Sequence, residues 1–264
     1  MLADYHMHTP LCKHAVGEPE EYARRAVERG IQEIGFSDHG PMPPDYDPDF
    51  RMREDQYPEY VDMVSRCRKA FPGLSIKLGL EADYHPGTEE FVRETIGRYE
   101  FDYVIGSVHY LGDWGFDNPE NVRRFEGRDV HALYAQYYEL VARLARTGLY
   151  DIVGHPDVIK KFGHRPDRDY EPLERRALEA VAAAGMALDV NTSGLRRPAK
   201  EIYPTLRMLR AARERGVGVT FGSDAHEPRL VGEAFDRAVA LVKAAGFTHF
   251  RRYTRRRFDL VPLP

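Results

Sequence analysis

The chain has 264 residues, an apolar content of 42% and a formal net charge of −4. This length fits one large α/β barrel or two ordinary domains, and the mild acidity argues against a general nucleic-acid binder, which is usually basic. No apolar run approaches the roughly 20 residues that a membrane span needs, and the N-terminus lacks the charged-then-apolar layout of a signal peptide.

Short β-like runs alternate with longer amphipathic stretches along the whole chain. Strands are predicted at residues 2–8, 33–39, 75–84, 102–110, 150–157, 186–194 and 218–226. Helices are predicted at about 18–30, 56–70, 88–98, 131–147, 171–184, 202–215 and 230–244, from apolar residues at three-to-four spacing. This alternation predicts a parallel sheet with right-handed crossovers. Seven strands and seven helices without a break in composition predict one closed barrel over residues 1–264.

Two long irregular segments interrupt the pattern, at residues 40–55 and 110–129. Both follow predicted strands, so both are expected over the same face of the barrel. Loops of this length are usually functional or disordered. Their aromatic and proline content favours an ordered lid.

Metal-competent side chains stand at the ends of nearly all the predicted strands. His6 and His8 are two residues apart on a strand, so their side chains share one face. Asp224 and His226 repeat this spacing near the end of the chain. The strands between them end with Asp38, His39, Glu81, His109 and His155, and His14 follows the first strand through a loop.

Each of these residues alone has an ordinary explanation. A single H-x-H is weak evidence for a metal, His39 alone could be a hydrogen-bonded histidine, Glu81 could pair with an arginine, and Asp224 could cap a helix. Together they meet at the carboxyl end of parallel strands, where barrels carry their active sites. A pocket of nitrogen and oxygen ligands suits zinc, iron or manganese.

Other candidates of the same residue types are expected to be structural. His85, His131, His164 and His249 are interpreted as loop or surface residues. Cys12 stands between ligand candidates, but a small packing thiol is the simpler interpretation.

The stretches "DYHMHTPLCKHA", "FSDHG", "GLEADY", "GSVHYL", "VGHPD" and "GSDAH" occur in this order from residue 4 to residue 226. With them the chain resembles the polymerase-and-histidinol-phosphatase family of metal-dependent phosphoesterases. The resemblance implies a distorted seven-stranded (β/α)7 TIM-like barrel, which agrees with the strand count above.

The resemblance also implies a centre of three divalent transition metal ions, zinc, iron or manganese. Carried over by motif, His6, His8, Glu81 and Asp224 would hold the first. Glu81 would bridge to the second, which His109 and His155 complete. His14, His39 and His226 would hold the third.

Three looser features resemble the histidinol-phosphate phosphatase branch of the family. They are the insert that begins at residue 40, the extension "GSVHYLGDWGFD" and the stretch "DVNTSGLRRP". The implied reaction is hydrolysis of L-histidinol phosphate, a phosphate monoester, in histidine biosynthesis. In the implied mechanism, a hydroxide shared by two metals attacks phosphorus in line.

Cationic and acidic side chains are expected to supplement the metals. Candidates for the phosphate are Arg196, Arg197, Lys160 and Lys161, and an arginine is favoured because its guanidinium can bind two oxygens at once. Asp38, grouped with Glu81 and His39 as catalytic, could relay a proton or simply orient a histidine. Partners for the substrate's ammonium and imidazole could come from Asp45, Tyr46, Asp47, Phe50, Asp113, Trp114 and Asp117.

Two other classes of function stay open at this point. One is a phosphodiesterase, nuclease or nucleotide phosphatase of the same family, which a basic groove leading from the metals would favour. The other is a metal-binding or docking protein without activity. With only two cysteines, a disulfide framework is not expected. We expect a cytoplasmic enzyme that meets small molecules, with no nucleic-acid or membrane partner.

Overall fold

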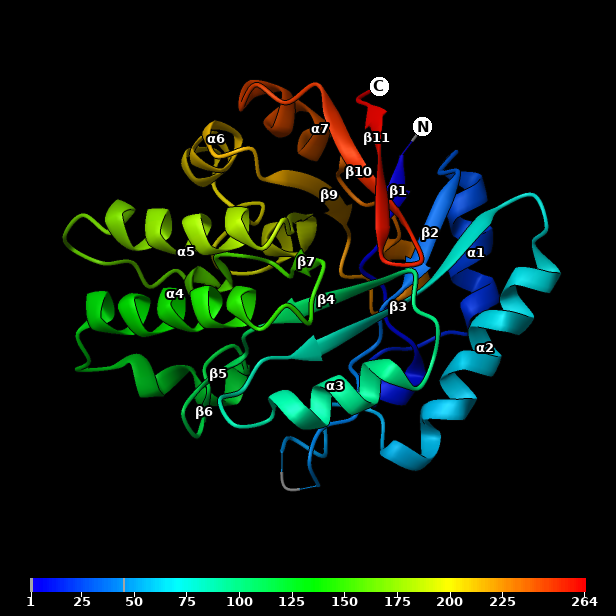
Figure 1. Cartoon of the computed structure of the whole chain (residues 1–264), viewed down its shortest axis with the longest axis horizontal. Coiled ribbons are helices and arrows are strands. Elements are labelled where there is room, and N and C mark those ends of the chain that lie inside the picture. Colours follow the sequence, from blue (N-terminus) through cyan, green and yellow to red (C-terminus); the bar gives the residue numbers. More distant parts are fainter. Residues whose placement is uncertain (1, 45) are drawn as a thin grey trace.

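The structure is a computed structural model that describes residues 2–44 and 46–264 (Figure 1). Asp45, one of the lid candidates, therefore lies outside the described residues. The strands are β1 (Ala3–Asp4), β2 (Glu33–Phe36), β3 (Ser75–Asp83), β4 (Tyr103–Ser107), β5 (Tyr110–Leu111), β6 (Trp114–Gly115), β7 (Ile152–Val153), β8 (Ala187–Asn191), β9 (Gly218–Gly222), β10 (His249–Thr254) and β11 (Arg257–Pro262). The helices are α1 (Pro19–Glu28), α2 (Tyr57–Ala70), α3 (Glu89–Gly97), α4 (Val130–Arg146), α5 (Glu171–Ala183), α6 (Leu206–Glu214) and α7 (Phe235–Ala244).

Seven of the strands form one parallel sheet in the order β1-β2-β3-β4-β7-β8-β9. The two edges of this sheet meet. The Tyr5 N–H donates to the Phe221 carbonyl at 2.9 Å, and Met7 pairs with Ala225 as an isolated parallel bridge. The helices lie outside this ring of strands (Figure 1). The predicted seven-stranded barrel is thus confirmed.

The inside of the barrel is filled by large side chains that need small neighbours. Tyr103 is fully buried, and its hydroxyl donates to the Tyr5 carbonyl at 2.7 Å. A Cβ at Gly35 or Gly79 would come within 2.3 Å of the Tyr103 side chain. Glycine at these two strand positions therefore makes room for the tyrosine, and the barrel is a packed core rather than a pore.

Two helices begin later than the periodicity predicts. The helix expected from residue 202 starts at Leu206, because Tyr203 pairs with Asn191 in an antiparallel bridge and Thr205 caps the helix through the Met208 N–H. The helix expected from residue 230 starts at Phe235, because a short 3-10 helix occupies Pro228–Leu230. In both cases the apolar pattern continues into a segment that has left the helical conformation.

A C-terminal hairpin was not predicted at all. β10 and β11 pair antiparallel through a two-residue turn, Arg255 and Arg256, both with positive φ. The turn lies near Asp102 and Asp151, which precede β4 and β7. The hairpin therefore covers the amino ends of the strands, opposite the expected site. None of the described helices has the length and apolarity to cross a membrane.

Candidate metal centre

The predicted metal ligands come together at the carboxyl ends of the barrel strands. Glu81 lies within β3, and the others follow β1, β2, β4, β7 and β9 directly or through a short loop. The nine residues are His6, His8, His14, His39, Glu81, His109, His155, Asp224 and His226. The strand order alone brings them together, because parallel strands of a barrel end at one face.

Glu81 stands at the middle of this group and is fully buried. Its Oε2 lies 3.2 Å from His6 Nε2 and 3.1 Å from His39 Nδ1. Its Oε1 lies 3.1 Å from His155 Nε2 and 3.7 Å from His109 Nε2. Each oxygen of one carboxylate thus faces a different set of histidine nitrogens, which is the arrangement that a bridging ligand needs.

Asp224 joins the group from β9. Its Oδ1 is 3.4 Å from His8 Nε2 and 3.4 Å from His226 Nδ1. Asp224 also adopts a positive φ of 52°, an uncommon conformation for a residue other than glycine. Such a conformation costs energy and is found in tight turns and at functional sites.

Pairs of histidine nitrogens approach each other closely. His14 Nε2 is 2.9 Å from His226 Nε2, and His109 Nε2 is 3.2 Å from His155 Nε2. The ligand atoms of His14, His39 and His226 all lie within 4.8 Å of one another. Two ring nitrogens at such distances either share a proton or face a common cation.

Several polar atoms in the group lack a hydrogen-bond partner among the described residues. These atoms are His6 Nε2, His8 Nε2, His39 Nδ1 and Glu81 Oε2, and all four are buried. Burying an unpaired polar atom costs about 1–3 kcal/mol, so four in one place indicate that something else satisfies them. Imidazole nitrogens with carboxylate oxygens suit zinc, iron or manganese, so the residues fit the expected metals.

The protonation states of several ligands also suit a metal. Burial alone would raise the pKa of Glu81, but the charge of the His6 ring and a hydrogen bond with His155 hold that pKa well below its usual range. Burial lowers the pKa of His39 and of His226 well below the usual value. The carboxylate is therefore charged and these two rings are neutral, as metal ligands must be.

Two of the histidines differ in this respect. Burial opposes a charge on His6, but Glu81 and Asp224 raise the pKa of this ring well above its usual value. The pKa of His8 is raised too, against the effect of burial, by the nearby carboxylates of Asp224 and Asp38. A metal that binds these rings must displace their protons.

Buried carboxylates hold the ligand rings from behind. Asp189 Oδ2 is 2.8 Å from His6 Nδ1 and accepts the His155 backbone N–H at 3.3 Å. Asp83 Oδ1 is 3.0 Å from His109 Nδ1. Partners of this kind fix the ring orientation of metal-binding histidines.

Asp83 and Asp189 were not among the site residues predicted from the sequence, although the position of each in its strand could have indicated a role. Asp83 is two residues after Glu81 on the same strand, so the two side chains share a face. Asp189 is a charged residue inside the apolar run "MALDVN". Burial favours the neutral form of Asp83, but Arg51 and His109 lower the pKa of this carboxyl to about 2.

Asp38 has a comparable position, behind His8. Its Oδ1 is 3.3 Å from His8 Nδ1, and its Oδ2 accepts from the Thr9 N–H and hydroxyl. Asp38 is fully buried and is not among the described residues that line the central cavity. Of the two roles considered for it, orienting a histidine fits this position better than relaying a proton to substrate.

A cavity of about 460 Å³ opens above the metal-ligand group. Both long irregular segments line it, the first with Asp47, Phe50 and Arg51 and the second with Tyr110 and Asp117. A volume of this size suits a small-molecule ligand.

Three of the four predicted phosphate-binding cations line this cavity. Arg197 lines it, and no ion pair of its guanidinium is found among the described residues. Arg196 also lines it but is bonded to Glu233 at 2.7 Å and to the Ser223 carbonyl at 2.8 Å. Lys161 lies 3.1 Å from Asp117.

Lys160 is placed differently. Its side chain is 1% exposed, and its ammonium is 2.7 Å from Asp157 and 3.2 Å from the Ile202 carbonyl. It is not one of the described residues that line the cavity. A buried, fully paired lysine of this kind joins two loops, so the structure argues against a direct contact with phosphate.

Some of the candidate residues from the two irregular segments line the cavity, and the others contact residues elsewhere. Asp47, Phe50 and Asp117 line the cavity. Trp114 is buried, with the guanidinium groups of Arg124 and Arg128 over its ring. The remaining candidates are also occupied elsewhere: Tyr46 donates to Asp83 and Asp113 pairs with Arg124.

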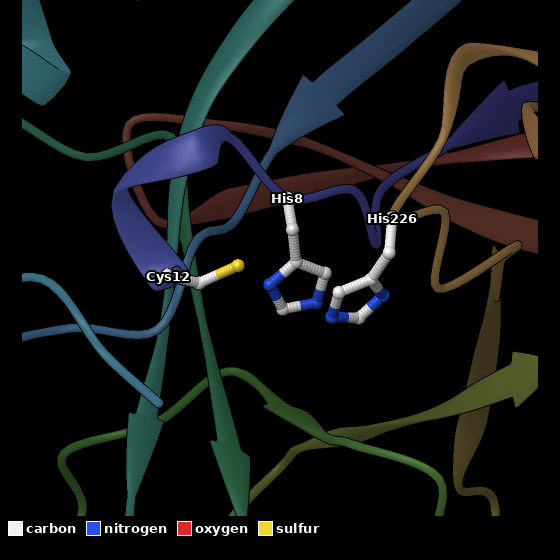
Figure 2. A group of neighbouring side chains, drawn as sticks. All are labelled: His8, Cys12 and His226. Carbon is white, nitrogen blue, oxygen red and sulfur yellow. The ribbon is translucent and has the colours of Figure 1, made fainter. Parts of the chain in front are cut away.

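Cys12 lies beside the group, as Figure 2 shows with His8 and His226. The two rings are stacked with centroids 4.0 Å apart, and the sulfur faces the His8 ring. Burial, together with the charge of Asp38, raises the pKa of the Cys12 thiol. A metal binds the thiolate form, so the raised pKa agrees with a packing role. His85, His131, His164 and His249 are not among the described residues that line the cavity.

A family model described as the PHP domain matches residues 4–193, and one described as PHP-associated matches residues 206–237. The chain is 51% identical over 247 residues to a protein of Deinococcus radiodurans with the name "Probable histidinol-phosphatase", covering 93% of this chain and 94% of that protein. It is 33% identical over 260 residues to the histidinol-phosphatase of Bacillus subtilis, covering 88% of this chain and 96% of the relative.

The fold has a close counterpart among solved structures. It is similar to the crystal structure of histidinol phosphate phosphatase from Lactococcus lactis, complexed with zinc, L-histidinol and phosphate, with a TM-score of 0.85. The two chains are 23% identical, and the match covers 98% of each. This likeness supports the barrel fold described above.

Proposed function

The chain belongs to the PHP domain family, and from this we propose that it is a metal-dependent phosphatase that hydrolyses L-histidinol phosphate to L-histidinol and phosphate. One observation carries the proposal: five of the other eight predicted ligands lie within 3.7 Å of the Glu81 carboxylate, in a chain 51% identical, over nearly its whole length, to a protein named as a histidinol-phosphatase. The reaction would belong to histidine biosynthesis.

The same nine residues would hold three divalent transition metal ions, which could be zinc, iron or manganese. The proposed sets are His6, His8, Glu81 and Asp224 for the first ion, Glu81, His109 and His155 for the second, and His14, His39 and His226 for the third. The contacts of Glu81 with His6 and His155 support its place in the first two sets. The close nitrogen pairs His109–His155 and His14–His226 support the second and third sets. Ions held there would activate a water molecule as the nucleophile and offset negative charge on the phosphoryl group.

Side chains around the cavity would bind the phosphate. Arg197 is the strongest candidate, because it lines the cavity and no ion pair of its guanidinium is found among the described residues. Arg196 and Lys161 line the same cavity but already have acidic partners. In this proposal they hold the walls of the site and contribute positive potential near the phosphate.

The rest of the substrate carries an ammonium and an imidazole. Asp47 and Asp117 offer carboxylates from the two irregular segments, and Phe50 offers an aromatic face. The Phe50 ring stands edge-on to His14, with centroids 5.6 Å apart, so this part of the cavity lies beside the proposed third ion. An acidic and aromatic lining is suited to a cationic heterocyclic substrate.

Catalytic roles are assigned to Glu81 and His39. Glu81 would hold the first and second ions in a fixed relation, since its two oxygens face different histidines. His39 lies 3.1 Å from Glu81 and lines the cavity, so it would orient the third ion toward the phosphate. Asp38 would act only through His8.

The setting of the enzyme is part of the proposal. Cys12 and Cys67 are both free thiols, which fits a reducing cytoplasm. We retain the prediction that residues 1–264 form a single barrel unit, with a small-molecule phosphate monoester as its partner and no nucleic acid or membrane.

The test is phosphate release from L-histidinol phosphate, measured beside a nucleoside monophosphate and a short single-stranded DNA. The protein is purified without chelators, and its metal content is measured on the same sample. Fast release from histidinol phosphate alone is expected. Preference for the nucleotide or the DNA would instead support a nucleotide phosphatase or a nuclease of the same family.

A further inference from the structure

Arg51 connects the irregular segment 40–55 to the barrel. The residue is only 3% exposed. Its Nη2 is 2.9 Å from Asp83 Oδ2 and 3.3 Å from Asp47 Oδ2, while Nη1 donates to the Gly40 carbonyl at 3.1 Å. One guanidinium thus binds the first residue and the middle of its own segment and a carboxylate on β3. A buried arginine with this many contacts fixes the path of the segment over the cavity.

Asp83 connects Arg51 to the proposed metal centre. It is fully buried, and its Oδ2 accepts from two donors of segment 40–55, Arg51 and the Tyr46 hydroxyl at 3.0 Å. Its other oxygen is 3.0 Å from His109 Nδ1. The opposite nitrogen of that ring lies 3.2 Å from His155 Nε2. The orientation of His109 therefore depends on a carboxylate that the segment itself holds.

This chain of contacts joins two parts of the protein that differ in structure. Segment 40–55 has no strand and no α-helix among its described residues, whereas β3 is a central strand of the barrel. Without the segment in place, Asp83 would lose two donors and would be left as a buried charge with His109 as its remaining side-chain partner. The His109 ring would then be less well fixed than it is with the segment in place, because Asp83 would have lost the two donors that hold it.

We propose that Arg51 is a positioning residue that couples the packing of segment 40–55 to metal binding at Glu81, His109 and His155. The inference rests on the metal centre of the proposed function. It follows from the geometry that the segment strengthens metal binding by fixing His109. By thermodynamic reciprocity, the metal strengthens the packing of the segment to the same extent.

The test compares Arg51→Met with Arg53→Met in otherwise unchanged full-length protein. Arg53 belongs to the same segment but is exposed, and its ion pair among the described residues is with the neighbouring Asp55, so it is a matched control. Metal-free protein is loaded with Zn²⁺ and titrated against a competing chelator. We expect Arg51→Met to lower the affinity for one of the three ions by about 10–100-fold and to leave the other two unchanged. Arg53→Met should match the wild type.

A second readout follows the segment directly. Hydrogen exchange of residues 46–52 should slow on Zn²⁺ loading in the wild type and in Arg53→Met, and should slow much less in Arg51→Met. A structural role alone would change exchange in the metal-free and loaded forms equally. That result, or an equal loss of all three ions, or an unchanged affinity, would overturn the inference.

Two further outcomes concern a variant that does not fold and a wild type that binds fewer ions than proposed. If Arg51→Met does not fold, Tyr46→Phe removes one donor to Asp83 and keeps the ion pair; it should weaken the same single ion by about twofold to tenfold, and no effect would overturn the coupling. If the wild type itself binds fewer than three ions, the proposed metal centre fails, which is a different result from a variant that binds like the wild type.

Discussion

Asp189 offers a sharp test of how the ligand rings are held. Its Oδ2 lies 2.8 Å from His6 Nδ1. The same oxygen accepts hydrogen bonds from the Asn191 side-chain amide at 2.9 Å and from the His155 backbone N–H at 3.3 Å. Asp189→Asn keeps the size and an acceptor oxygen but removes the charge. A hydrogen bond to a charged group contributes about 1.5–3 kcal/mol and a neutral one about 1 kcal/mol. The expected loss is therefore about 1–2 kcal/mol.

This energy corresponds to roughly a 5–30-fold weaker metal affinity. Since Asp189 contacts residues of both proposed sets that share Glu81, two ions should weaken and the third should not. The assay is chelator competition followed by metal analysis. Asp151→Asn is the control, because Asp151 is mostly buried and paired with Arg256 at the other end of the barrel. It should lower the melting temperature without changing metal affinity.

Equal metal affinity in Asp189→Asn and the wild type would refute the reasoning. So would an equal loss in Asp189→Asn and Asp151→Asn, because the effect would then reflect general destabilisation. Weakening of all three ions would contradict the division of the ligands.

Four other predictions can be checked with the same protein. Glu81→Ala should reduce phosphatase activity by more than about 10³-fold and lose two ions together; metal analysis that still finds all three would exclude a bridging role. Arg197→Ala should raise KM for small phosphate monoesters by about tenfold to a hundredfold with little change in melting temperature, and unchanged steady-state kinetics would move the phosphate site elsewhere. Metal affinity should fall as the pH is lowered from about 8 to about 6, because acidic neighbours outweigh burial and raise the pKa of His6 and His8, so that protons compete with the metal; a flat profile in chelator competition would contradict this. Burial raises the pKa of Cys67 to about 12, so iodoacetamide at neutral pH should modify Cys67 in unfolded protein and leave it intact in the native state, as mass spectrometry of peptides would show.

The four basic candidates for phosphate binding differ in burial and in their acidic partners, and these differences could not be predicted from the sequence. Arg196, Arg197, Lys160 and Lys161 are equivalent in the sequence, as two basic dipeptides after predicted strands. In the structure Lys160 is buried against Asp157, whereas Arg197 lines the cavity. Burial and the position of an acidic partner are long-range properties, so neighbouring positions with the same chemistry acquire different roles.

The barrel and the candidate ligand set could both be predicted from the sequence. Alternation of strands and helices predicts parallel strands, and parallel strands deliver their carboxyl ends to one face. Residues such as His6 and His8 could be placed there because a strand repeats every two residues. These inferences need only local periodicity and one rule of topology.

The residues that support this candidate set became visible only in the folded protein. Asp83, Asp189 and Arg51 contact the ligand rings, or the residues behind them, from distant parts of the chain. No local pattern encodes a contact between Asp189 and His6, which are 183 residues apart. Such partners emerge only when the barrel closes, because closure removes water from the ligand rings and leaves buried carboxylates as their hydrogen-bond partners.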